Sequence, residues 1–329
     1  MTGISVAFRY AIAGAMALMP VSGIHAQDAF QSFKQLNSTA KMPKLNAFSS
    51  TGTDTAGIAS KDVILEAKLT ADDEPMDEGL TWRVFGLISG DDGKLPLLAS
   101  SEGGAAAFQL MPGDYFVNVA FGRAGATKKL TVPAEGDVEK QVLILDAGGV
   151  VLDAVSGSDV PIPPNKLNFS IYSAEVQEDG ERGLVVADVR PDIIVRLNAG
   201  TYHVVSEYGG INAVVRADIQ VEAGKLIEAT LQHRAAEITL KLVSQAGGEA
   251  IADTAWSVLT AAGDIVSESV SAFSTMVLAE GDYLAVARNK DRIYQRAFSI
   301  KAGENRDVEV LMQEQSSEVG VLHNAELRD

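Results

Sequence analysis

The sequence predicts an all-β protein made of three tandem antiparallel β-sandwich modules. A Gly-x-Tyr motif occurs three times, and its tyrosines are 87 and 81 residues apart: Tyr115, Tyr202 and Tyr283. An aromatic residue upstream keeps the same period, at 87 and 87 residues: Trp82, Phe169 and Trp256. Short segments of period-two alternation are separated by Gly- and Asp-rich turns, and helical periodicity is nowhere sustained. This pattern is typical of β-sandwiches.

Each unit has the same predicted order of strands. It opens with an apolar strand, "VILEAKL" from Val63, "VVLDAV" from Val150 or "ITLKLV" from Ile238. A loop, the aromatic strand, a turn and a short strand ending in Leu follow, and then come the Gly-x-Tyr strand and two closing strands. We therefore predict repeat 1 at 62–147, repeat 2 at 148–235 and repeat 3 at 236–313. The connections between repeats are very short.

The two ends of the chain read differently from the repeats. Residues 1–26 have one basic residue, Arg9, a short apolar run and small residues before Gln27, which is the order of a secretory signal peptide. The apolar run is shorter than the roughly 20 residues of a membrane-spanning helix. Residues 27–61 are polar and rich in Ser and Thr, and they predict a flexible, disordered arm. Residues 314–329 predict a disordered tail.

Charge and cysteine content exclude several function classes. The formal net charge of the 329-residue chain is −17, and such a surface repels nucleic acid and anionic lipid. The chain has no Cys, which excludes disulfides, thiolate metal ligands and thiol catalysis. We expect no nucleic-acid partner and no integral membrane segment after signal cleavage. The expected location is the periplasm, with secretion beyond the cell as the alternative.

The repeated Gly-x-Tyr motif has a structural and a functional interpretation. In a sandwich corner, Tyr buries its ring and bonds its hydroxyl to nearby backbone, while Gly gives the turn its freedom. The predicted corner residues are Gly113, Tyr115, Gly200, Tyr202, Gly281 and Tyr283. The functional alternative is a cation bound by the residue between them, but Asp114 and Asp282 are replaced by Thr201 in the middle repeat. Asp and Thr both accept a backbone N–H in turns, so we favour the structural interpretation.

The order of strands and motifs resembles the carboxypeptidase-regulatory-like, or prealbumin-like, β-sandwich superfamily, an Ig-like fold. The middle repeat carries the resemblance best, in "GVVLDAVSGSDVPIPPNKLNFSIYSAE", "VRLNAGTYHVVSEYG" and "IQVEAG". The third repeat also looks like parts of uncharacterised exported proteins of Gram-negative bacteria. The resemblance implies an accessory or structural role and transfers no catalytic residue. Some relatives crosslink a Lys to an Asn, and Lys68 and Lys241 lie on opening strands, but no Asn stands on every closing strand.

Reactive side chains are sparse. Of the four histidines, only His203 and His233 fall in the repeats, and we expect a partly buried His203 with a hydrogen-bond partner. Acidic turns at 71–79, 89–94 and 177–183 are the candidates for calcium, although none has the alternating ligand spacing of a calcium loop. We predict no catalytic residue, no cofactor and no metal site. An enzyme would need a pair of carboxylates acting as in glycosidases.

One hairpin of repeat 3 stands out because it is basic in an acidic protein. The stretch "ARNKDRIYQR" places four cations around one aromatic residue, and these are the candidate partner-binding residues: Arg288, Lys290, Arg292, Tyr294 and Arg296. A basic hairpin with an aromatic residue suits an anionic partner, whereas a solvated hairpin tip is the plainer interpretation. The sequence therefore predicts a non-catalytic envelope scaffold that binds an unknown envelope protein or glycan. The alternative is a glycan-binding or adhesin-like secreted module.

Overall fold

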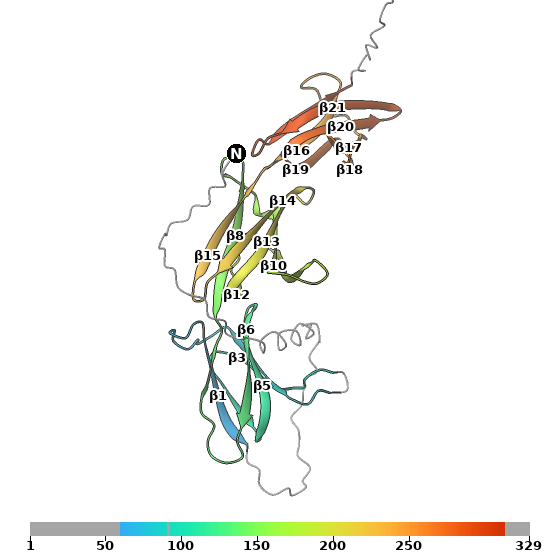
Figure 1. The fold of residues 1–329 in the computed structure, drawn as a ribbon. Coiled ribbons are helices and arrows are strands. Elements are labelled where there is room, and N and C mark those ends of the chain that lie inside the picture. The colour runs from blue at the N-terminus through green and yellow to red at the C-terminus, as the bar shows by residue number, and fades with distance from the viewer. Residues whose placement is uncertain (1–59, 91–92, 313–329) are drawn as a thin grey trace, which may run out of the picture. The chain divides into compact units, whose positions relative to one another are not determined.

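The computed structural model describes residues 60–90 and 93–312. The predicted signal peptide, the arm up to residue 59 and the tail at 314–329 lie outside the described residues. The described residues fall into two units. The larger holds residues 60–88 and 96–312 and contains three β-sandwich modules (Figure 1). The described part of the smaller is a turn in which the Gly90 N–H donates to the Lys94 carbonyl.

The first module has seven strands in two sheets, with orders β4-β1-β7 and β3-β2-β5-β6. The strands are β1 (Lys61–Lys68), β2 (Leu80–Gly86), β3 (Leu97–Gly103), β4 (Ala106–Leu110), β5 (Gly113–Phe121), β6 (Ala124–Val132) and β7 (Gln141–Ile144).

The second module repeats this arrangement, with sheets β12-β8-β15 and β11-β10-β13-β14 and a short strand, β9, paired with β8. Its elements are β8 (Ala147–Ser156), β9 (Val160–Pro161), the single-turn 3-10 helix η1 (Pro164–Lys166), β10 (Leu167–Val176), β11 (Arg182–Val189), β12 (Val195–Asn198), β13 (Gly200–Tyr208), β14 (Ala213–Val221) and β15 (Leu226–His233).

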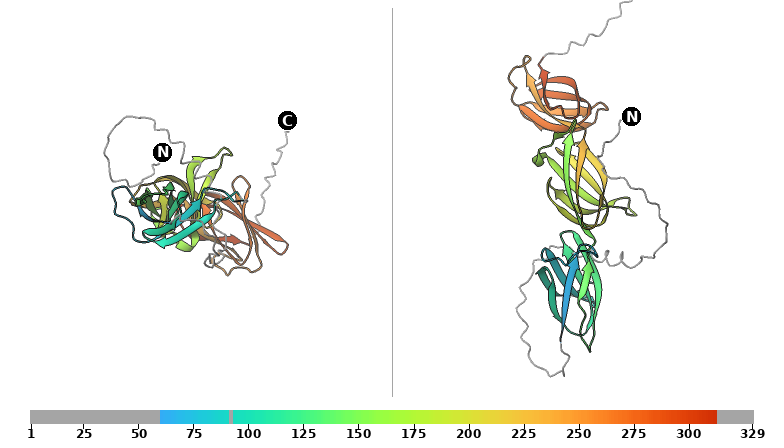
Figure 2. Two further views of the ribbon diagram at one scale, coloured as in Figure 1. Left: turned by 90° about the horizontal axis from the view of Figure 1, so that it is seen from below. Right: turned by 90° about the vertical axis from the view of Figure 1, so that its left-hand side faces the viewer.

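The third module has sheets β19-β16-β22 and β18-β17-β20-β21. Its strands are β16 (Ala235–Val243), β17 (Ala255–Thr260), β18 (Ile265–Val270), β19 (Phe273–Ala279), β20 (Gly281–Asn289), β21 (Arg292–Ile300) and β22 (Arg306–Leu311). Each module is built from one contiguous stretch of the chain, as the colours show (Figure 2).

The all-β prediction is confirmed, since the described residues contain strands and no α-helix. Two details differ from the sequence expectation. The closing strand of each module pairs in parallel with the opening strand, as β7 does with β1, so the smaller sheet is not purely antiparallel. Each module also has a strand, β3, β11 or β18, that the sequence interpretation assigned to a turn. These three strands lie at a sheet edge.

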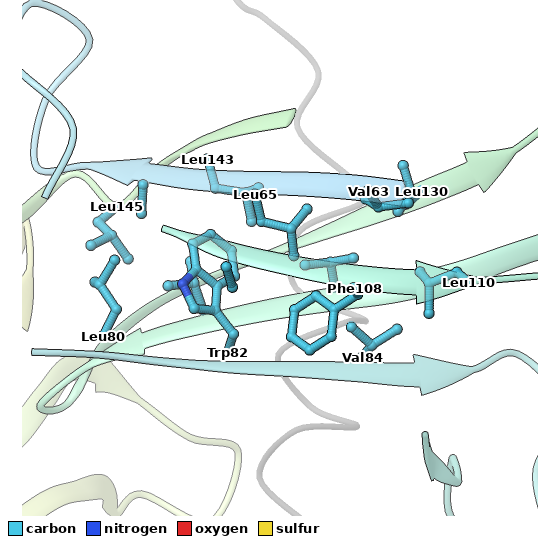
Figure 3. Packing of buried hydrophobic residues seen from close by; sticks show 14 of the residues in the cluster. Val63, Leu65, Leu80, Trp82, Val84, Phe108, Leu110, Leu130, Leu143 and Leu145 are labelled. Carbon is cyan, nitrogen blue, oxygen red and sulfur yellow. The ribbon is translucent and has the colours of Figure 1, made fainter. Parts of the chain in front are cut away.

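Each module encloses its own core between its two sheets. Alternate residues of β1 and β2 point inward, so Val63, Leu65 and Trp82 are completely buried (Figure 3). Burying such apolar side chains stabilises the fold by roughly 1.5–3 kcal/mol each. Equivalent strands supply the cores of the second and third modules. Because the chain has no disulfide, this burial is the main source of stability.

Consecutive modules are joined by direct backbone contacts. The Ala199 N–H donates to the Asp146 carbonyl at 2.6 Å, and the Glu280 N–H donates in the same way to the Arg234 carbonyl at 2.8 Å. Asn198 adds side-chain bonds, since its Nδ2 donates to the carbonyls of Gly125 and Leu145. The short connections are thus fixed by hydrogen bonds on both sides.

Candidate functional site

The three corner tyrosines make the same bond. Each hydroxyl donates to the backbone carbonyl four residues earlier, with O–O distances of 2.7, 2.9 and 2.9 Å for the pairs Tyr115–Met111, Tyr202–Asn198 and Tyr283–Ala279. The preceding glycines, Gly113, Gly200 and Gly281, have φ of 156°, 153° and 157°, a region that side-chain-bearing residues rarely adopt. The hydroxyls and the glycine backbones of the motif are therefore engaged in the fold.

The residue between Gly and Tyr bonds across the hairpin. Asp114 accepts from the Thr131 hydroxyl and pairs with Lys129, and together these partners lower the pKa of the Asp114 carboxyl. In the other copies, the Thr201 hydroxyl donates to Gln220, and Asp282 accepts from Ser299. We expected backbone N–H partners here. The partners are side chains instead, because the motif lies within a paired strand whose opposite residue faces the same side.

The repeated aromatic residues of β2, β10 and β17 are core residues. Trp82 and Phe169 are completely buried, and Trp256 is 2% exposed. Both indole N–H groups donate to backbone carbonyls, Trp82 to Gly104 at 2.8 Å and Trp256 to Ser271 at 2.9 Å. These side chains cannot act as a platform for a sugar.

The five residues of the basic hairpin do not form one surface. Arg288, Lys290 and Arg292 are exposed at the end of the β20–β21 hairpin. Tyr294 faces inward and is only 4% exposed in the core of the third module, so it cannot contact a partner. The Arg296 guanidinium donates to the Glu309 carbonyl of β22 and so links the two sheets. The sequence pattern could not separate these roles, because inward and outward positions alternate along β21.

Exposed apolar side chains complete the surface around the hairpin. Ile293 is paired with Arg288 across the hairpin and is 66% exposed. On the other side, Ala255 of β17 lies between Arg288 and Val270, and Val270 is 75% exposed. We call Val270, Arg288, Lys290, Arg292 and Ile293 the hairpin surface. Ile293 and Val270 were missed by sequence reasoning, because a sequence does not show which face of an edge strand is uncovered.

A second surface feature is repeated in all three modules. One row of residues across the outer face of the four-stranded sheet is largely apolar: Leu97–Phe85–Phe116, Leu184–Tyr172–His203 and Ile265–Leu259–Leu284. The edge-strand members are 45%, 55% and 59% exposed. A register irregularity adjoins the row in each module, and such bulges commonly re-aim side chains. We call these residues the outer row.

The two histidines of the described residues have different environments. His203, in the outer row, bonds Asp218 Oδ1 through Nδ1 at 2.7 Å. His233 is 1% exposed and its Nε2 lies 2.8 Å from the Ser206 hydroxyl, while burial lowers the pKa of its imidazole to about 4. Ser206 is completely buried, and His233 Nδ1 has no hydrogen-bond partner. A nucleophile–base pair needs access for substrate and a group that orients the base, and neither is present here.

Two carboxylates of the acidic turns accept hydrogen bonds from residues close to them in sequence. Asp73 accepts from the backbone N–H and the hydroxyl of Thr70, and Asp179 accepts from the Glu181 N–H. On the first strand of the third module, Lys241 pairs with the carboxylates of Asp307 and Glu309 rather than with an Asn. In residues 60–90 and 93–312, no group of three or more His, Asp or Glu side chains gathers as a metal site would require.

The fold defines a tandem array of β-sandwich modules. A family model described as the Rhizobiales growth-associated tandem repeat domain matches residues 237–312, within the third module. Among solved structures, the chain is similar to a streptococcal ancillary pilin, with 14% identity, coverage of 78% of this chain and 100% of that chain, and a TM-score of 0.27. It is similar to GBS52, the minor pilin of Streptococcus agalactiae, with 14% identity, 53% and 95% coverage and a TM-score of 0.29.

A further similarity is to the Bacillus anthracis TIE protein, with 17% identity, 77% coverage of this chain and a TM-score of 0.22. The chain spans about half, 51%, of the length of that protein. No curated protein matches the sequence. In the part of the chain that the structure describes, no helix is long and apolar enough to cross a membrane. The resemblance to carboxypeptidase-regulatory-like domains stays a prediction.

Proposed function

We propose that the protein is a non-catalytic scaffold of the cell envelope, exported to the periplasm, whose repeats at 62–147, 148–235 and 236–313 position a binding surface. One observation carries the proposal: the corner and aromatic residues that all three modules share serve the fold. The Gly-x-Tyr motif forms a sandwich corner, and the aromatic residue fills the core. The match of the third module to a growth-associated repeat family supports a role in growth.

The proposal that the protein is not an enzyme rests on the buried Ser206–His233 pair. A Ser206→Ala variant removes the only hydroxyl placed to act as a nucleophile beside a His in the described residues. We expect this variant to keep its cellular function and to lose about 1 kcal/mol of stability, since one hydrogen bond is removed. Loss of function by a folded Ser206→Ala protein would argue for catalysis instead.

Export is tested by cell fractionation and N-terminal sequencing of the mature protein. The account expects a periplasmic protein that begins at Gln27, or at Ile24 if cleavage follows Gly23. The charge pattern of the first 26 residues supports this expectation. An uncut chain that stays in the cytoplasm would overturn the proposed location.

Glycan binding is the second candidate, and the outer row favours it. Partly exposed aromatic residues are present there in two modules, as Phe116 and Tyr172, whereas Phe85 is only 7% exposed. In the second module His203 and Asp218 add polar groups. Flat apolar side chains beside hydrogen-bonding groups are the ordinary means of binding a sugar ring. Retention on peptidoglycan or lipopolysaccharide that is lost in Tyr172→Ala would support this candidate, and no retention at low salt would remove it.

A further inference from the structure

The hairpin that follows the corner strand docks onto the next module at the first junction. At the tip of the β5–β6 hairpin, the Arg123 N–H donates to the Arg196 carbonyl at 3.0 Å. The Arg196 guanidinium lies 4.5 Å from the centre of the Phe121 ring, within the range of a cation–π contact. A Cβ on Gly122 would lie 3.0 Å from the Arg196 Cβ, so the two backbones approach closely.

The equivalent hairpin of the second module contacts the third module at the second junction. At the tip of β13–β14, Asn212 Oδ1 accepts from the Ala279 N–H and Nδ2 donates to the Tyr283 hydroxyl, both at 2.9 Å. A Cβ on Gly209 would lie 2.4 Å from the Val277 Cβ. Gly122 and Gly209 are 87 residues apart, the period of the modules. The hairpin is thus a docking element that the chain uses twice, each time on the strand before the corner Tyr.

The third copy of this hairpin has a different tip. β22 is the last strand of the described residues, and no contact between this tip and a further module is described there. Lys290 occupies the position of Gly122 and Gly209, with φ of 53°, and Arg292 follows two residues later. Both internal hairpins have Gly as the first residue of the tip, Gly122 before Arg123 and Gly209 before Gly210, whereas the third tip is Lys290–Asp291 with Arg288 and Arg292 beside it. Gly122 and Gly209 leave room for the next module, and Lys290 stands at the same position in the third hairpin. We infer that this tip contacts a different kind of surface.

The hairpin surface combines charge with apolar area. Arg288 and Ile293 point to one face of the hairpin, whereas Arg292 is paired with the buried Asn289 and points to the other face. Lys290 and Asp291 form the turn between the two strands. Val270 and Ile293, at 75% and 66%, are among the most exposed large apolar residues of the described chain, and both lie in the same cross-strand row as Arg288. Exposed apolar side chains beside charges are typical of a protein interface rather than of a solvated turn.

We propose that the hairpin surface is the docking site for an acidic, extended segment of another envelope protein. The inference rests on the proposed scaffold function and names its partner's chemistry. The segment is expected to be extended because both internal copies of the hairpin dock onto strand residues, partly through backbone groups. It is expected to be acidic because three exposed cations, Arg288, Lys290 and Arg292, outnumber the one acid of the tip, Asp291. Apolar side chains in the segment would cover Ile293 and Val270.

A second copy of this chain suits the surface less well. At both internal junctions, an N–H before the corner Gly donates to the preceding module, from Ala199 and from Glu280. The equivalent residue of the first module is Pro112, which has no N–H. The first module therefore lacks a donor that an added module would need, so addition of another copy at that end does not reproduce the internal junction.

The test is site-specific photocrosslinking of the full chain in its native cell. A photoreactive phenylalanine replaces Ile293, and the same replacement at Val176, which is 57% exposed on the second module, is the matched control. We expect an adduct from position 293 that maps to one envelope protein at a segment rich in Asp and Glu. It should be absent from position 176 and lost in Arg288→Glu/Arg292→Glu. Changing the mapped acidic residues to Lys should restore it.

A synthetic peptide of the mapped segment gives the affinity. The double charge reversal should weaken its binding about tenfold or more, because two attractive contacts become repulsive. The inference fails if position 293 gives no adduct, if both positions give the same adduct, or if charge reversal leaves the adduct unchanged. It also fails if the adduct is a glycan or a second copy of the chain. Each of these results leaves the export and scaffold proposal standing, whereas a cytoplasmic, uncut protein would contradict that proposal.

Discussion

Two adjacent glycines allow the second module junction to be tested with a built-in control. Gly209 and Gly210 lie at the tip of the β13–β14 hairpin with nearly equal φ, 75° and 76°. A Cβ at Gly209 would lie 2.4 Å from the Val277 Cβ, whereas a Cβ at Gly210 would meet nothing within 4 Å. Gly209→Ala and Gly210→Ala therefore share the same backbone strain and differ in the contact with the third module.

The magnitudes follow from these distances. An Ala at positive φ costs about 1–2 kcal/mol, and this cost applies to both variants. Two carbon atoms in contact prefer a separation of roughly 3.5–4.0 Å, so Gly209→Ala must push Val277 away by more than a small adjustment. Such overpacking costs a further ~1–3 kcal/mol. Val277 packs in the core of the second module, so the loss should appear in the unfolding of that module.

Differential scanning calorimetry of the full chain measures the difference. For a domain of this size, 1 kcal/mol corresponds to about 4–8 °C in Tm. Gly210→Ala should lower the affected transition by one such step, and Gly209→Ala should lower it by about 4 °C or more beyond that. Equal Tm values for the two variants would refute the close approach of Gly209 to Val277, and with it the reasoning that this hairpin is a docking element.

Further predictions concern the Tyr202 corner, the buried His233 imidazole and the hydrogen bond from Arg296 to β22. Tyr202→Phe should cost about 1 kcal/mol in urea unfolding, because the bond from its hydroxyl to backbone is lost, while Tyr172→Phe on the outer face should change stability by less than about 0.5 kcal/mol. The pKa of His233 is about 4 in the folded protein against an ordinary 6.5, so the unfolded chain takes up the proton first as pH falls. Stability should therefore be complete above pH 6.5 and decline between pH 6.5 and 4, with a smaller decline in His233→Gln. Arg296→Ala should lower stability without weakening partner binding, measured by unfolding and by the crosslink from Ile293, because its guanidinium contacts β22.

The fold class could be predicted from the sequence because the three copies vary at some positions and agree at others. Every repeat has a Gly and a Tyr at the positions of Gly200 and Tyr202, because the corner needs both the backbone freedom of Gly and the hydrogen bond from the Tyr hydroxyl. Each repeated Trp or Phe fills the same place in a core. Agreement between copies within one chain thus indicated fold residues.

The edge strands and the partners of surface residues could not be predicted. β3, with the sequence LLASSEG, has only partly buried or exposed residues, so the alternation that marks a half-buried strand is missing. The residues around Tyr294 are charged and suggest a surface hairpin. Tyr294 is paired with the buried Ala287, however, and so its side chain points into the core. Close approaches such as Gly209 to Val277 join residues far apart in sequence, and no local pattern encodes them.

The most direct test is complementation of a strain that lacks the protein. Two variants, Ser206→Ala and Arg288→Glu/Arg292→Glu, are compared after their expression and folding have been checked. The central claim is that function lies at a surface where the repeats differ and not in buried reactive groups. We predict that Ser206→Ala restores growth of the strain, whereas Arg288→Glu/Arg292→Glu does not. Restoration by the charge-reversed variant together with failure of Ser206→Ala would contradict it.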